Sequence, residues 1–214
     1  MTTQELLEAG IEHNTPRVRE LIILAEDHAF SPEESRELAP WLLRYAERYR
    51  ESDDPQDAGV VWSAIRTGAS MLTPAEANQL RGLLEPGYPI ETSLVAVKML
   101  GRIFEAQPPA AVDEHPMLAG KVQEMADALL NRHVIPQSEC AAKAVLAVYA
   151  LAAMASSTIE PTVQRVKELR IDWFTRRTRR KLHDLHSTWR QRPAPVADAP
   201  LRLLESALRM LDEV

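Results

Sequence analysis

The pattern of apolar and polar residues has a helical period along nearly the whole chain. Apolar residues recur every three or four positions, as they do along the buried face of an α-helix. In three segments they extend almost all the way around the helix, and such helices need cover on every side. These segments are residues 58–71, 91–106 and 138–156, and more amphipathic helices alternate with them. The pattern therefore predicts an all-α protein, with Leu100 and Leu146 in its core.

Four dipeptides mark helix starts in the same way. A Ser, Thr or Asp side chain accepts hydrogen bonds from the free N–H groups of the first turn, and the proline after it fits the first helical position. Two of these starts also have a glutamate three residues after the cap, which is typical of a capping box. The dipeptides are Thr15-Pro16, Ser31-Pro32, Asp54-Pro55 and Thr73-Pro74, and the glutamates are Glu34 and Glu76. We therefore expect helices joined by short connections, with a helix over 73–84 as one of them.

A weak internal repeat relates the three apolar segments. Residues 64–68 align with 97–101, and residues 144–147 fall at a comparable place in the third segment. Successive units are then about 33 to 47 residues apart, which is a spacing typical of stacked helical repeats. With its paired helices, its prolines near the joints and one buried Ala/Leu/Val helix per unit, the chain resembles the HEAT and armadillo-type α-solenoids over roughly residues 15–190. The resemblance implies a short array of stacked antiparallel helix pairs; a compact, irregular helical bundle is the alternative.

The C-terminal region departs from this pattern. Residues 193–200 are rich in Pro and Ala and have no helical period, which is typical of a stiff linker. We therefore expect a helical-repeat domain over 1–192, a linker over 193–200 and a final helix over 201–214. Terminal repeats need to cover the open end of an array, so this helix is expected to dock on it as a cap. The alternatives are a helix that binds a partner or one that exchanges between protomers. Its apolar stripe consists of Leu201, Leu204, Leu208 and Leu211.

Charge is distributed very unevenly along the chain. The net charge is −6, yet residues 165–192 contain ten Lys and Arg against three Asp and Glu. This window therefore has a net charge of +7 and the rest of the chain one of −13. The first 57 residues alone contain fourteen acids and six bases. Such a balance argues against general binding to nucleic acids or to membrane surfaces, and it singles out the basic window.

Within the basic window, apolar residues at helical spacing predict one buried face, so the arginines project from the opposite one. Trp173 lies away from the apolar face, and an exposed Trp beside arginines is a common hot spot of protein interfaces. The candidate anion- or partner-binding residues are therefore Trp173, Arg176, Arg177, Arg179 and Arg180. In the alternative interpretation the arginines solvate the helix and pair with acids of neighbouring helices, while Trp173 packs against the preceding helix.

Signatures of catalysis or of metal binding are absent from the sequence. It contains no Gly-rich phosphate loop, no HExxH and no GxSxG motif. His183 and His186 form an i,i+3 pair that lacks the further ligands of a metal site. The single cysteine, Cys140, lies in an apolar run and is expected to be a buried, inert thiol. We therefore predict no catalytic, cofactor-binding or metal-binding residue, and no cofactor; this favours a non-enzymatic protein.

Helical arrays present long, semi-rigid surfaces, so we expect an adaptor or scaffold that binds an acidic segment or peptide of a partner protein. The alternative is nucleic-acid binding or processing through residues 165–192. The alkylpurine DNA glycosylases of HEAT-like fold resemble this chain in size and helix content, although none of their catalytic residues has a match here. An enzyme with an unrecognised site is a third possibility. The longest apolar run, 144–155, is too short to span a bilayer, so we expect no membrane partner and a cytoplasmic location. The sequence leaves the oligomeric state open.

Overall fold

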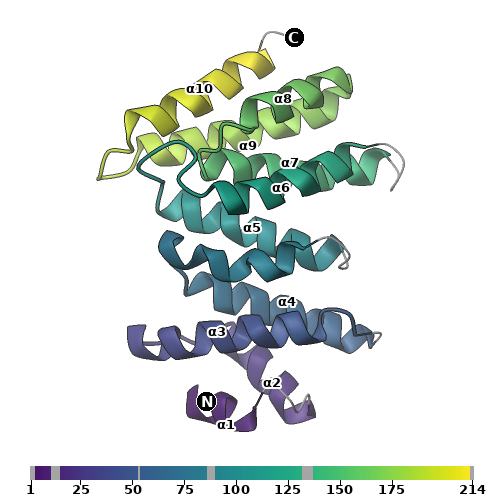
Figure 1. Cartoon of the computed structure of the whole chain (residues 1–214), viewed down its shortest axis with the longest axis vertical. Helices are drawn as coiled ribbons and strands as arrows, with labels where there is room; N and C mark the ends of the chain where they lie inside the picture. The colour runs from purple at the N-terminus through teal and green to yellow at the C-terminus, as the bar shows by residue number, and fades with distance from the viewer. Residues whose placement is uncertain (1–2, 11–14, 53, 86–89, 132–136, 213–214) are drawn as a thin grey trace. The chain divides into compact units, whose positions relative to one another are not determined.

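The computed structural model describes residues 3–10, 15–52, 54–85, 90–131 and 137–212, and over these residues it contains helices and no strand (Figure 1). The prediction of an all-α protein is thus confirmed. By their internal contacts the residues divide into two compact units, Met1–Met99 (unit 1) and Leu100–Val214 (unit 2). That one helical-repeat domain covers 1–192 stays a prediction. None of the described helices is both long enough and apolar enough to cross a membrane.

Unit 1 is built from short helices in which consecutive pairs pack together. Helix α1 contacts α2 and α3, α4 contacts α2 and α3, and α3 also contacts the 3-10 helix η1. Helix α5 begins in this unit and ends in unit 2. The bounds are α1 (Thr3–Ala9), α2 (Pro16–Ala25), α3 (Pro32–Tyr49), α4 (Pro55–Ser70), η1 (Pro74–Leu84) and α5 (Ile90–Ala106).

Three of the four predicted helix caps are formed as expected. The Thr15 side chain accepts from the backbone N–H of Val18, Asp54 accepts from that of Gln56, and Ser31 forms a complete capping box. At Thr73 the glutamate half of the predicted capping box is formed, because the Glu76 carboxylate accepts from the Thr73 backbone N–H at 3.0 Å. The Thr73 hydroxyl donates to the Glu76 carboxylate at 2.7 Å, and the Glu76 N–H bonds the Thr73 carbonyl at 3.0 Å. This i→i+3 bond belongs to a 3-10 helix, which is what the segment forms.

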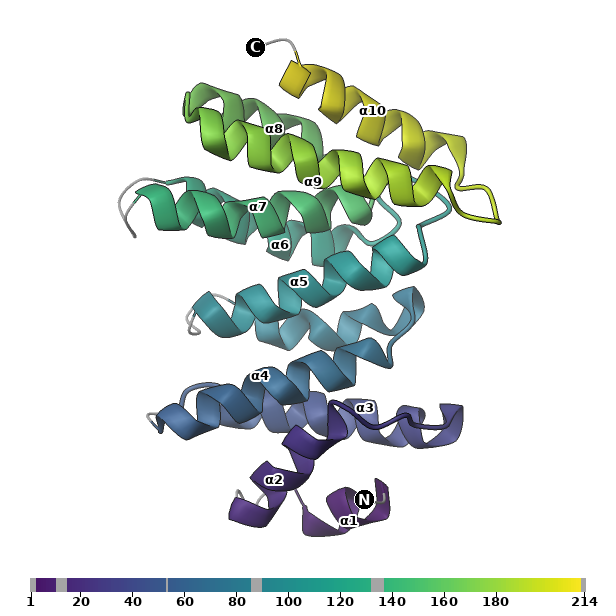
Figure 2. The same ribbon diagram turned by 180° about the vertical axis from the view of Figure 1, so that it is seen from behind.

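Over its described residues, unit 2 adds the helices α6 to α10, of which the last three lie side by side in both Figure 1 and Figure 2. Helix α10 packs against α8 and α9, as expected for a docked C-terminal helix. It begins at Asp198, so the predicted linker over 193–200 ends three residues early. Pro200 is accommodated because the N–H groups of a first turn have no partner within the helix. The bounds are α6 (Pro116–Leu130), α7 (Gln137–Ala153), α8 (Ile159–Glu168), α9 (Asp172–Arg190) and α10 (Asp198–Asp212).

The three apolar segments that the periodicity indicated contribute to the core, together with the apolar faces of the other helices. Leu100 is fully buried, and the buried thiol of Cys140 agrees with the sequence. Leu146, in contrast, is only half-buried, so its prediction as a core leucine is wrong. Ala142 and Lys143 are half-buried as well, and the spacing of the three residues places them on one strip of α7. Helix α7 is therefore covered on most of its circumference but not on all of it.

Tyr149 joins three elements of unit 2. Its ring lies so close to α5 that a Cβ atom at position 101 would overlap it, which explains why Gly101 stands there. Its hydroxyl donates to Glu105 at 2.5 Å, and the ammonium of Lys181 on α9 lies 5.7 Å from its ring centroid. The end of α5, the middle of α7 and the middle of α9 thus meet around one side chain, and this helps to fix α9 in place.

Candidate anion-binding site

Helix α9 presents one apolar face and one basic face. Its buried face consists of Phe174, Thr178, Leu182, Leu185 and Trp189, as the spacing predicted. Ile171, which the spacing also placed on this face, is only half-buried and lies just before the helix. At 100° per residue the outer side chains then fall on two neighbouring strips. Arg176 and Arg179 lie on the strip that begins at Asp172, whereas Trp173, Arg177 and Arg180 lie on the strip beside it.

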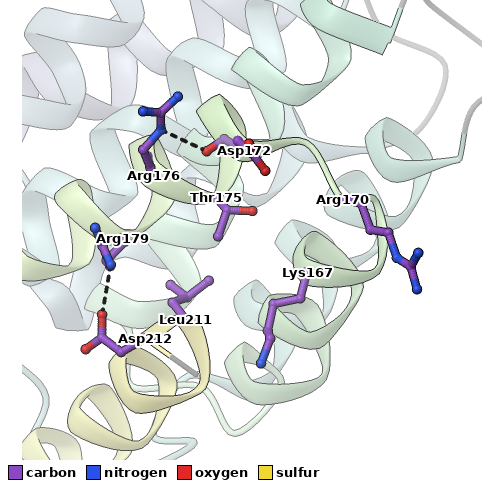
Figure 3. Close-up of a pocket in the computed structure, with 8 residues that line it drawn as sticks. All are labelled: Lys167, Arg170, Asp172, Thr175, Arg176, Arg179, Leu211 and Asp212. Atoms are coloured by element: carbon purple, nitrogen blue, oxygen red, sulfur yellow. Dashed lines mark hydrogen bonds and ion pairs between the residues drawn. The ribbon is translucent and has the colours of Figure 1, made fainter. Parts of the chain in front are cut away.

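The first strip borders a cavity of about 640 Å³ within unit 2 (Figure 3). The end of α8, the turn that follows it, the first half of α9 and the last turn of α10 enclose this cavity. Its only described apolar lining residue is Leu211, which is itself buried. The lining residues are Lys167, Arg170, Asp172, Thr175, Arg176, Arg179, Leu211 and Asp212.

Four basic side chains and two acidic ones line the cavity, so its surface is positive on balance. Arg179 Nη1 pairs with Asp212 Oδ1 at 3.2 Å, and Arg176 Nε donates to the backbone carbonyl of Asp172 at 3.4 Å. Figure 3 shows these two arginines on one side of the cavity and Lys167 and Arg170 on the other. The four cationic groups do not converge on one point. This arrangement suits an extended anionic ligand better than one small ion.

The second strip is open to solvent. Trp173 is 39% exposed, and its ring lies 6.1 Å from that of Phe174, measured between centroids. Arg177 and Arg180 are exposed as well. Among the residues that the structure describes, no acid forms an ion pair with either arginine. All five candidates named from the sequence are thus on the outer face of α9, but only Arg176 and Arg179 line the cavity.

Part of the basic window is neutralised by acids of the same chain. Arg165 pairs with Asp127, and Arg190 pairs with Glu205 at 2.6 Å. Glu205 also contacts His186, and the hydrogen bonds from Arg190 and His186 hold the pKa of its carboxyl below the usual range. Ion pairs within the chain therefore neutralise Arg165 and Arg190, which lie near the two ends of the window, and Arg179.

Sequence reasoning missed several residues of the cavity. Lys167 and Arg170 lie within the basic window of residues 165–192, and its excess of Lys and Arg was the signal that could have identified them. Leu211 was assigned only to the apolar stripe of the last helix. Nothing in the sequence pointed to Asp212, because it meets Arg179 only when α10 folds back over 33 positions of chain.

The described part of the chain holds no group of three or more His, Cys, Asp or Glu side chains suited to a metal ion. The chain matches no protein-family model, no curated protein and no solved structure. The resemblance to HEAT and armadillo-type solenoids therefore rests on the helix pattern alone. A function has to be argued from the surface of α9 and its surroundings.

Proposed function

We propose that this chain is a non-enzymatic scaffold of the HEAT/armadillo type, and that it binds an acidic segment of a partner protein on the basic side of α9. The observation that carries the proposal is the unneutralised charge of this side. Four cations line one cavity against two acids, one of which pairs with Arg179, and Arg177 and Arg180 next to it have no ion pair with any described acid. On a chain with a net charge of −6, such an excess fits a surface that meets an anionic partner.

The contacts between helices support the repeat architecture. In unit 1, α1 and α2 form one pair and α3 and α4 the next, with α1 against α3 and α2 against α4. In unit 2, α6 and α7 are followed by α8 and α9, with α6 against α8 and α7 against α9. Within each unit, the first of these pairs therefore stacks on the second through equivalent helices, which is how solenoid repeats pack. Helix α10 contacts α8 and α9, as a capping helix would.

The chemistry of the surface favours a protein segment as the ligand. The cations are spread along the cavity and the neighbouring strip, so they match carboxylates distributed along an extended chain. Trp173 adds apolar surface, and Trp beside arginine is the composition typical of protein-interface hot spots. Double-stranded DNA carries one charge about every 1.7 Å of its axis, which is a denser row of charge than these separated cations present.

The backbone at Arg170 gives independent support. This residue has a φ of 51°, in the left-handed region, immediately after α8. Glycine is the residue preferred in this conformation at a helix end, and other residues are strained there. An arginine at a position where glycine is preferred suggests that its side chain is needed at the rim of the cavity.

The proposal is tested by the anisotropy of a fluorescein-labelled poly-glutamate peptide. We expect the peptide to bind the intact chain. Its affinity is expected to fall about tenfold or more when Arg176, Arg177, Arg179 and Arg180 are all changed to Gln. Trp173→Ala is expected to cost about 2 kcal/mol of binding free energy, the value that defines a hot spot. The matched control is Arg202→Gln, an exposed arginine on α10 outside the cavity. Equal affinity of the fourfold variant and the intact chain contradicts the proposal.

Nucleic-acid binding is the second candidate, because exposed Trp and Arg side chains also stack on bases. A labelled oligothymidine in the same assay separates the two. Tight oligothymidine binding that falls steeply with salt would favour a nucleic acid, since each neutralised phosphate releases about one counterion. Preference for the poly-glutamate peptide, with a weaker dependence on salt, supports the acidic protein segment.

A further inference from the structure

The last turn of α10 places a carboxylate on the basic cavity. Asp212 pairs with Arg179 at 3.2 Å, and both side chains are about half exposed. An ion pair with this exposure is weak, because water and salt compete for both partners. The contact of Asp212 with Arg179 is thus one that another carboxylate can replace (Figure 3).

The two acids of the cavity differ in what they do for their helices. Asp172 lies in the first turn of α9, where a negative charge is favourable beside the free N–H groups. Asp212 lies at the opposite kind of position, in the last turn of α10, where the helix dipole favours a cation. The helix itself therefore gains nothing from Asp212, and its one described partner is Arg179.

Helix α10 is anchored firmly enough to hold Asp212 in this place. Leu211, the residue before it, is buried, and so are Leu201, Leu204, Ala207 and Leu208 along the same face. Glu205 ties the middle of the helix to α9 through Arg190 and His186. A carboxylate attached to a docked helix has a high effective concentration at the cavity, so it competes with an external ligand despite the weakness of a single pair.

We infer that Asp212 is an internal ligand of the basic cavity, and that an acidic segment of a partner binds by displacing it from Arg179. The inference rests on the proposed function, because it assigns the regulation of the same site. The displaced carboxylate marks a subsite for one acidic side chain of the partner.

The test uses the labelled poly-glutamate peptide and the full chain with Asp212→Asn, which keeps the size of the side chain and removes its charge. We expect binding to tighten roughly two- to fivefold at low salt, the factor equivalent to one exposed ion pair. Asp198→Asn, at the other end of α10, removes the same charge and is expected to leave the affinity unchanged. In an Arg179→Gln background the gain from Asp212→Asn is expected to disappear, because the two residues act through one contact.

The outcomes separate the inference from the proposed function. If Asp212→Asn has no effect while the fourfold arginine variant loses binding, the internal ligand is refuted and the acidic-segment site stands. Equal gains from Asp212→Asn and Asp198→Asn would show a general effect of net charge and also refute the inference. If the peptide binds neither the intact chain nor Asp212→Asn, both proposals fail. A gain that is specific to Asp212 and depends on Arg179 supports both.

Discussion

Units 1 and 2 use their arginines in different ways. Residues 1–99 contain nine Lys and Arg against seventeen Asp and Glu, a net charge of −8, whereas residues 100–214 contain sixteen against fourteen, a net charge of +2. In unit 1 the arginines lie among an excess of acids. Arg19 bridges Asp54 and the buried Asp57, at 3.1 and 3.0 Å, and Arg66 pairs with Glu26. Arg19 thus joins α2 to α4 and its cap residue, and Glu26, the residue after α2, is joined to Arg66 on α4.

In unit 2 the basic residues are concentrated on one helix, and nearby acids engage only some of them. Arg177 and Arg180 remain exposed on α9 with no described ion pair. The same type of residue therefore holds helices together in unit 1 and remains available at the surface of unit 2. The difference lies in the number of acidic residues nearby, because an arginine surrounded by carboxylates forms ion pairs within its own unit. We use four predictions to test this contrast.

The largest effect is expected in the apolar core, which is where the units are alike. Leu42 in unit 1 and Leu100 in unit 2 are both fully buried. Replacing either with Ala is expected to lower the free energy of unfolding by about 2–5 kcal/mol, because it removes buried methyl groups and leaves a cavity. Chemical denaturation measures this loss. Leu146→Ala serves as the partly exposed control and should cost less; losses below about 1 kcal/mol at both buried sites would contradict the assigned core.

The contrast itself is tested by Arg19→Met and Arg177→Met. Loss of Arg19 leaves the buried carboxylate of Asp57 without this partner, so we expect unit 1 to be destabilised by about 1–3 kcal/mol. Loss of Arg177 removes no described ion pair, and the change is expected to stay within about 0.5 kcal/mol. Thermal and urea unfolding of the two variants provide the comparison. Similar losses in both would mean that α9 uses its arginines structurally as well.

Arg170 allows stability and binding to be separated. Arg170→Gly relieves the left-handed conformation and is expected to raise the free energy of unfolding by about 1 kcal/mol. It also removes one cation from the cavity, so the affinity for the poly-glutamate peptide should fall. Arg170→Ala is the matched variant, because it removes the same charge but keeps a Cβ atom in the strained conformation. A gain in stability from Ala as well as from Gly would show that backbone strain is not the cause.

The smallest effect concerns Glu205, which joins α10 to α9. Its pKa is lowered in the folded chain, chiefly by the hydrogen bond from Arg190, so ionisation of its carboxyl favours folding. This stabilisation is present above the unfolded pKa, about 4.3, and is lost as the pH falls through the lower folded value. Glu205→Gln should therefore cost at most about 1 kcal/mol at neutral pH, since solvent screens the partly exposed pair. Melting temperatures measured from pH 7 to pH 3 should converge for the two proteins.

The apolar periodicity of the sequence was sufficient to predict the helices and most of the buried residues. The period of an α-helix is a local property, so the apolar face of α9 followed from spacing alone, and three of the helix caps followed from the Thr-Pro, Ser-Pro and Asp-Pro dipeptides. The same reasoning was only partly right at Thr73, where the Glu76 carboxylate accepts from the Thr73 N–H as expected but the segment forms a 3-10 helix. It failed at Leu146, because the strip of α7 that stays partly exposed depends on which helices cover it.

The candidate site was predictable only in part, for a related reason. Spacing placed all five candidates on the outer face of α9, because that face is set by the helix itself. It did not separate Arg176 and Arg179, which line the cavity, from Trp173, Arg177 and Arg180 beside it. That division depends on where α8 and α10 pack against α9. The contact between Arg179 and Asp212 exists only because buried leucines far along the chain bring α10 back over α9. Local sequence determines which residues a helix exposes, whereas tertiary packing determines which of them face a common ligand.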